Sequence, residues 1–183
     1  MKRRAFLKTA AAVFPAAVLE DYVLGQDSIP ASHDPIHAVG AGQDRFDETH
    51  SLGFSTILFK TATRETNGSL FVIEHKNLRK GGPPMHIHLH QEEFWYVLEG
   101  EVLFQLGDKR QKLGPGDSIV GPRGVPHGFT LVSEKPGRMV IAFTPAGKME
   151  QFFRDIAVPG GPKLEAAVFA KYEMEMVGPP VVA

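Results

Sequence analysis

From residue 53 onward the chain alternates short apolar runs with turns rich in Gly, Pro, Asn and Asp. A new run begins about every 8–12 residues, the spacing of short antiparallel strands. Leu70–His75 and Glu93–Leu98 are typical runs, and Gly114–Asp117 is a typical turn. The pattern predicts about seven to nine strands and an all-β sandwich or barrel over residues 51–146.

The composition agrees with a compact, turn-rich domain and excludes several functions. Gly and Pro number 19 and 14, and 43% of the residues are hydrophobic, which is too many for a disordered chain. Twenty Lys and Arg balance 21 Asp and Glu, so we expect no nucleic-acid partner. Because there is no Cys, disulfides and thiolate metal sites are excluded. Metal or acid–base chemistry is left to the carboxylates and eight His residues.

Residues 1–25 are predicted to be an export signal rather than part of the domain. A basic start with Arg3 and Arg4, followed by Phe6-Leu7-Lys8, precedes a short apolar stretch. This start resembles the twin-arginine signal of bacteria, which implies a periplasmic or extracellular protein that is exported already folded. The alternative is a basic amphipathic helix of a cytosolic protein. Residues 26–50 have no clear periodicity and are expected to form an N-terminal arm.

The last segment, residues 147–183, changes to helical spacing. Its apolar residues recur at three- and four-residue intervals at Met149, Phe152, Phe153 and Ile156. A second helix is expected over residues 162–173, before Gly178 and two prolines prevent further helix. The sequence therefore predicts C-terminal helices packed on the β domain.

Three His residues and one Glu occur where strands are predicted. Residues two apart on a strand point to the same face, so His86 and His88 can converge on one ion. Glu93 lies at an odd offset from them, so the residues between must turn or bulge to bring it to the same interior. His127 heads another strand after a Pro-rich turn. Glu92 is the rival of Glu93 at this position.

Other polar residues near these four leave alternatives open. His90 is an alternative ligand, a substrate contact or a solvated turn residue, the last being favoured. Arg123 is expected to be a turn residue. Four further histidines lie outside any ligand spacing and are given no role: His33, His37, His50 and His75.

Taken together, the spacing resembles the two motifs of the cupin family. The first is His86-x-His88-x4-Glu93-x6-Gly100, and the second is Gly116-x5-Pro122-x-Gly124-x2-His127. Two positions depart from the family pattern: Lys80 stands where a Gly is usual, and Leu131 where Asn is frequent. Neither is a ligand position. The resemblance implies a single small cupin β-barrel, a jelly roll also called a double-stranded β-helix, with C-terminal helices.

The resemblance also implies one divalent transition metal held by His86, His88, Glu93 and His127. Three imidazoles and a carboxylate suit Fe, Mn, Co, Ni, Cu or Zn. Fe or Mn is favoured, because a protein that folds before export can retain an ion that binds weakly. The alternative is a metal-free barrel that keeps these residues.

Strand alternation extends the prediction to the lining of a pocket. Residues that share a face with the expected ligands should surround the metal with apolar side chains, as is usual for a small-molecule site. The predicted lining is Trp95, Val97, Phe129, Leu131, Met139, Ile141 and Phe143. On the opposite face of the same run lie Phe94, Tyr96 and Leu98, which the C-terminal helix or a homodimer partner should cover.

The stretch from Pro83 to Glu101 and the tail from Ala170 to Pro180 are similar to small cupins of the quercetin dioxygenase-like group. This resemblance implies an oxidoreductase that inserts O2 into a phenolic or enolic small molecule. Glu93 is then the expected catalytic residue, accepting the substrate's hydroxyl proton. Since a fold does not determine a function, two alternatives stay open. They are a non-enzymatic binding or sensing protein and a metal-dependent isomerase or decarboxylase.

Overall fold

The computed structural model describes residues 38–183; the predicted export signal and the first part of the predicted arm lie outside the described residues. The strands are β1 (His50–Ser51), β2 (Thr56–Phe59), β3 (Phe71–Leu78), β4 (Pro84–His88), β5 (Glu92–Glu99), β6 (Val102–Leu106), β7 (Lys109–Leu113), β8 (Ser118–Gly121), β9 (His127–Leu131), β10 (Gly137–Thr144) and β11 (Met174–Pro180). The helices are the 3-10 helix η2 (Thr63–Thr66), α1 (Met149–Ile156) and α2 (Ala166–Lys171). Among the described residues, no helix is long and apolar enough to cross a bilayer.

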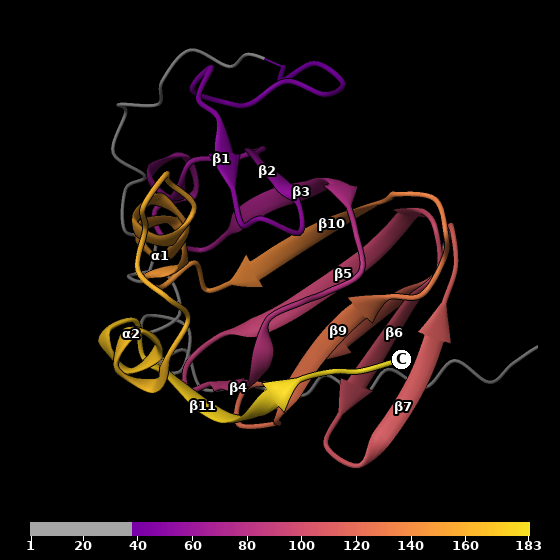
Figure 1. The fold of residues 1–183 in the computed structure, drawn as a ribbon. Helices are drawn as coiled ribbons and strands as arrows, with labels where there is room; N and C mark the ends of the chain where they lie inside the picture. Colours follow the sequence, from indigo (N-terminus) through magenta and orange to yellow (C-terminus); the bar gives the residue numbers. More distant parts are fainter. Residues whose placement is uncertain (1–37) are drawn as a thin grey trace, which may run out of the picture. The chain divides into compact units, whose positions relative to one another are not determined.

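The strands form two antiparallel sheets that face each other (Figure 1). The six-stranded sheet has the order β1-β2-β3-β10-β5-β8, and the five-stranded sheet has the order β11-β4-β9-β6-β7. Two facing antiparallel sheets with short C-terminal helices are the predicted all-β architecture, which is confirmed.

Strand alternation places apolar side chains between the sheets. On β10 the buried residues are Met139, Ile141 and Phe143, while the residues between them are only half-buried. The register aligns Phe143 with Glu93 of β5, and Met139 with His75 of β3. Glu93 therefore lies beside Phe143 at one end of the interior. His75 lies beside Met139, which is four residues away from Phe143 on β10.

Helices α1 and α2 follow β10 and lie at one end of the sheets in Figure 1. The predicted apolar face of α1 is confirmed, because Met149, Phe152, Phe153 and Ile156 are all buried. From α2, Phe169 is buried and contacts Phe152, with ring centroids 5.8 Å apart. The two short helices thus cover that end with aromatic side chains.

The chain ends in a strand that the sequence analysis did not predict. β11 pairs with β4, matching Met174 to His88 and Met176 to His86. Gly178 and the two following prolines argue against a central strand, because Pro cannot donate to the ladder. β11 is an edge strand of its sheet, and an edge tolerates Pro. The C-terminal tail is therefore helical only in part.

Candidate metal centre

Three strands bring the four predicted ligands together. β4 carries His86 and His88 on one face, β5 presents Glu93 at its second residue, and β9 begins with His127. All four residues are buried, and one ligand atom from each lies within 4.8 Å of the others. β4 ends at His88 and β5 begins at Glu92, so the predicted turn between them exists and returns Glu93 to the interior.

Backbone carbonyls orient two of the imidazoles. His86 Nδ1 lies 2.8 Å from the carbonyl oxygen of Pro84, and His127 Nδ1 lies 2.9 Å from that of Val125. A carbonyl only accepts hydrogen bonds, so each Nδ1 carries the proton and donates it. In the neutral ring Nε2 is then left with its lone pair, the state in which His binds a metal.

Glu93 is the anionic member of the group. Its Oε2 lies 3.1 Å from His88 Nε2 and 3.2 Å from His127 Nε2. Burial alone would raise the pKa of Glu93, but the imidazoles of His127 and His88 beside its carboxylate outweigh burial and hold that pKa below its ordinary value. The Glu93 side chain is therefore a carboxylate at neutral pH.

His86 is a neutral imidazole at neutral pH. Burial, reinforced by the neighbouring His127 and His88, lowers the pKa of His86 to about 3, although Glu93 opposes the shift. A neutral imidazole is the ligating form of His. The site thus pairs one carboxylate with an imidazole that is already deprotonated for binding.

The donor set fits a transition metal. His88 is 1% exposed, and neither of its ring nitrogens has a hydrogen-bond partner within the described part of the chain. A buried polar atom without a partner is costly, and a cation bound at Nε2 would remove that cost. Three imidazole nitrogens and one carboxylate oxygen match the ligand preferences of Fe, Mn, Co, Ni, Cu and Zn. His86, His88, Glu93 and His127 would together hold such an ion.

A second cluster of potential ligands is explained by structural contacts. Asp44, Glu48 and His50 also have ligand atoms close together. Asp44 accepts backbone hydrogen bonds on both carboxylate oxygens, including one of 2.6 Å from Phe59. Arg154 donates to Glu48 at 2.6 Å. These carboxylates stabilise the segment before β2, and nothing else about them indicates an ion.

The geometry distinguishes Glu93 from its neighbours in the turn. Glu92 points to the opposite face of β5 and forms a two-bond ion pair with Arg123, at 2.5 and 2.6 Å. Arg123 therefore does more than close a turn. His90 is exposed, as expected for a solvated turn residue. Of these residues, only Glu93 faces the three histidines.

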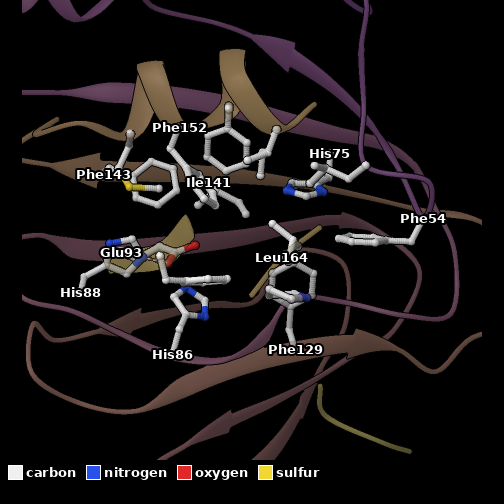
Figure 2. A pocket seen from close by; sticks show the side chains of 16 residues that line it. Phe54, His75, His86, His88, Glu93, Phe129, Ile141, Phe143, Phe152 and Leu164 are labelled. Carbon is white, nitrogen blue, oxygen red and sulfur yellow. Dashed lines mark ion pairs between the residues drawn. The ribbon is translucent and has the colours of Figure 1, made fainter. Parts of the chain in front are cut away.

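An apolar pocket opens directly from these ligands (Figure 2). Sixteen residues line it, including His86, His88 and Glu93. Twelve of the sixteen are apolar, and six of those are phenylalanines: Phe54, Phe129, Phe143, Phe152, Phe153 and Phe169. No Lys, Arg, Asp, Ser or Thr is among them. The pocket therefore suits an apolar or aromatic molecule better than a sugar or an anion.

The structure divides the predicted pocket residues into two groups. Phe129, Ile141 and Phe143 line the pocket. Trp95, Val97, Leu131 and Met139 are buried in the core and are not part of that lining. Trp95 still contacts the centre, since its ring centroid lies 5.2 Å from that of His127.

Some lining residues could not be assigned from the ligand motifs. Those from α1, α2 and the loop between β1 and β2, such as Phe152, Phe169 and Phe54, depend on how distant segments pack over the barrel. His75 is different, because it lies on β3 in the same alternation as Phe71 and Ile73. That alternation was a usable signal for its inward direction, although not for a function.

The two facing sheets have the cupin fold. Residues 77–143 match the cupin domain family, and this segment contains all four predicted ligands. A comparison with curated protein sequences finds no match.

Solved structures agree on the fold. An RmlC-like cupin from Shewanella frigidimarina is 22% identical, with a TM-score of 0.52 over 65% of this chain and 99% of its own. The nucleoside dehydratase Pac13, a Streptomyces protein, is 13% identical, with a TM-score of 0.50 over 73% of this chain and 87% of its own. At these identities the likeness concerns the fold alone.

Proposed function

We propose that this cupin is a metal-dependent dioxygenase that acts on a small apolar phenol or enol, as in the quercetin dioxygenase-like group. The observation that supports this most is the position of a buried three-His, one-Glu group at the wall of a phenylalanine-lined pocket. The pocket can bind an aromatic or apolar body, and the ligands can bind an ion beside it. When bound, the ion supplies Lewis-acid and redox chemistry toward O2.

Glu93 is the proposed catalytic residue. It is buried, lines the pocket and is ionised at neutral pH, so its carboxylate can accept a proton from a substrate hydroxyl. Its lowered pKa makes it a weak base, so it would accept this proton only from a hydroxyl that a cation held by the four candidate ligands had made more acidic. Both atoms of O2 enter the product of a dioxygenase, so the reaction needs no external reductant.

The volume of the pocket limits which molecules can enter it. The cavity volume is about 40 Å³, enough for about two or three water molecules. An aromatic substrate therefore enters only when part of the wall shifts. One wall is formed by α1, α2 and Leu164, which lie in sequence between β10 and β11, and we propose that this wall is the part that moves. Closure over the substrate would then exclude water from the site.

The metal and the location of the protein are proposed together. The twin-arginine-like start supports export of a folded protein to the periplasm or beyond, with Fe or Mn bound before export. A reporter fused behind residues 1–50 should be exported, and replacing Arg3 and Arg4 by Lys should retain it in the cytosol. Metal analysis of protein from the native periplasm should then find Fe or Mn; stoichiometric Zn or Cu would contradict this assignment.

Oxygen consumption tests the activity. Full-length protein loaded with Fe²⁺ or Mn²⁺ is offered catechols, flavonols and 1,3-diketones in an O2-electrode assay, with His86→Ala as the control that lacks a ligand. We expect uptake of O2 with at least one compound and two ¹⁸O atoms in the product from ¹⁸O2. Binding without turnover by fully metallated protein would favour a non-enzymatic binding protein, and turnover without O2 uptake would favour an isomerase or decarboxylase.

A further inference from the structure

Besides His86, His88 and Glu93, one further polar side chain lines the pocket. It is His75, which is not part of the candidate metal centre. His75 lies on the interior face of β3, is 2% exposed and lines the same pocket as His86, His88 and Glu93. It pairs in register with Met139, whereas Glu93 pairs with Phe143. In Figure 2, His75 and Phe54 lie at the opposite end of the pocket from Glu93 and His88.

One nitrogen of His75 is held by the protein. Nδ1 lies 2.8 Å from Ser55 Oγ, which is itself buried. The ring is also fixed by two aromatic neighbours, with Phe54 stacked at a centroid distance of 6.1 Å and Phe129 edge-on at 5.7 Å. These contacts leave little freedom for the imidazole to rotate.

The other nitrogen of His75 has no partner. Across residues 38–183, no hydrogen bond to Nε2 is present, although the ring is buried. A buried polar atom normally has a partner, because leaving it unpaired costs free energy. The twelve other non-ligand residues of the pocket lining are apolar and cannot supply one. His75 Nε2 is not among the fully enclosed side-chain atoms that have no partner, so it faces the space of the pocket, where a water molecule or a bound ligand can pair with it.

The charge state of the ring limits the kind of partner. Burial lowers the pKa of His75 to about 4, although Glu93 opposes the shift, so the imidazole is neutral at neutral pH. When the Ser55 hydroxyl donates to Nδ1, Nε2 carries the proton and donates; in the other tautomer Nε2 accepts. A neutral group that can donate or accept suits a hydroxyl or carbonyl, not an ion.

We propose that His75 is the second polar anchor of the pocket, and that the natural ligand carries a hydroxyl or carbonyl group opposite the end that lies at the metal centre. The proposal rests on the function proposed above, and it narrows the substrate class. The ligand is an apolar, ring-sized molecule with oxygen at both ends. His75 positions the ligand from the far end and does not touch the reacting atoms.

Two variants separate this role from a purely structural one. In His75→Asn the shorter amide can keep a hydrogen bond to Ser55 but does not reach the place of Nε2. In His75→Gln the longer amide reaches the pocket. A structural role predicts that Asn preserves function, whereas a ligand-anchoring role predicts that Gln does.

The probes are benzohydroxamate, whose hydroxyl and carbonyl oxygens bind metals, and its 3-hydroxy and 4-hydroxy derivatives. Binding to the full-length protein is measured by calorimetry after reconstitution with Zn²⁺, which has no redox chemistry. We expect one hydroxy derivative to bind about three- to ten-fold more tightly than the parent compound. His75→Asn should lose this gain and His75→Gln should keep part of it, while all three proteins bind the parent compound and Zn²⁺ equally well.

Other results would contradict either the role of His75 alone or the proposed function as well. A gain that persists in His75→Asn, or parent binding with no gain for either derivative, overturns the role of His75 and leaves the proposed function intact. If the metallated wild-type protein binds none of the three compounds, the proposed function fails, and the role of His75 fails with it.

Discussion

His86 of β4 and His127 of β9 face each other across an antiparallel strand pair, with ring centroids 4.6 Å apart. This pairing joins the two His-containing segments, which are separated in sequence by four other strands. The metal centre therefore depends on how well β4 is held against β9. On its other side β4 is held by β11, the last strand of the chain.

Removal of β11 should destroy the metal centre. A chain ending at Glu173 leaves β4 as an edge strand, without the partners of His86 and His88. We expect metal affinity to fall at least 100-fold, because loss of positioning groups around ligands costs about 10- to 100-fold even when the ligands themselves remain. Calorimetric titration with Zn²⁺ measures the change. A control lacking only Val182 and Ala183, which follow β11, should bind normally; equal affinity in both truncations would refute this role.

Gly121 is predicted to be intolerant of any side chain. A Cβ there would lie 2.6 Å from the Trp95 ring and 3.3 Å from His127 Nδ1. In Gly121→Ala the Trp95 ring, which contacts His127, must shift, and overpacking of this kind costs about 1–3 kcal/mol. Urea denaturation and metal titration should both show a loss. Gly114→Ala is the matched control, since a Cβ there would lie 3.9 Å from Asp117 Oδ2, which is an ordinary contact distance.

Acid should destabilise the metal-free protein. His75 and His86 have pKa values lowered to about 4 and about 3, so the unfolded chain takes up protons below pH 6.5 that the folded chain does not. Unfolding free energy therefore falls as pH decreases from 6.5 to 4, by about 3 kcal/mol for His75 alone. Glu93, whose pKa is lowered, adds to the loss below its unfolded value of about 4.5.

Chelator-treated protein provides the measurement for that prediction. Urea unfolding at several pH values should show a slope that is smaller by about 1 kcal/mol per pH unit in His75→Asn than in the wild type. Parallel pH profiles for the two proteins would show that His75 is not a buried neutral imidazole. The comparison does not require a ligand or a metal.

The homodimer predicted from the outer face of β5 remains a prediction. Tyr96 is 38% exposed and Val120 on neighbouring β8 is 48% exposed, so the C-terminal helices leave this face uncovered. If it forms the interface, Tyr96→Asp should convert a dimer to a monomer in sedimentation analysis, because a charge is costly in a buried interface. A wild-type monomer at micromolar concentrations would contradict the prediction. Lys109→Asp on β7 serves as an exposed control.

The sequence predicted most of the strands because they follow local rules, and the resemblance to the cupin motifs implied the four candidate ligands that the fold brings together. Alternation places His86 and His88 on one face, and the turn before Glu93 is required by its odd offset. The depth of the pocket was not predictable in the same way. Val97 and Met139 point inward as expected, but they lie further along the strands, where the core is closed. Alternation gives the direction of a side chain and not its position along the barrel.

Two other differences have distinct physical causes. β11 contains residues that disfavour strands, and its pairing with β4 depends on a partner far away in sequence. His75 is a single His that follows Phe71 and Ile73 on the interior face of β3, a pattern that ordinary core histidines share. Its importance appears only when Ser55 and the pocket are placed around it.

Metal stoichiometry of neighbouring glutamate variants tests the central claim most directly. Glu92 and Glu93 are adjacent in sequence, yet one pairs with Arg123 and the other faces the three histidines. Full-length protein should bind about one transition metal ion per chain by elemental analysis. Glu92→Gln should retain it, whereas Glu93→Ala and His127→Ala should lose it. Full occupancy in both of the latter variants, or no bound metal in the wild type after reconstitution, would contradict the account.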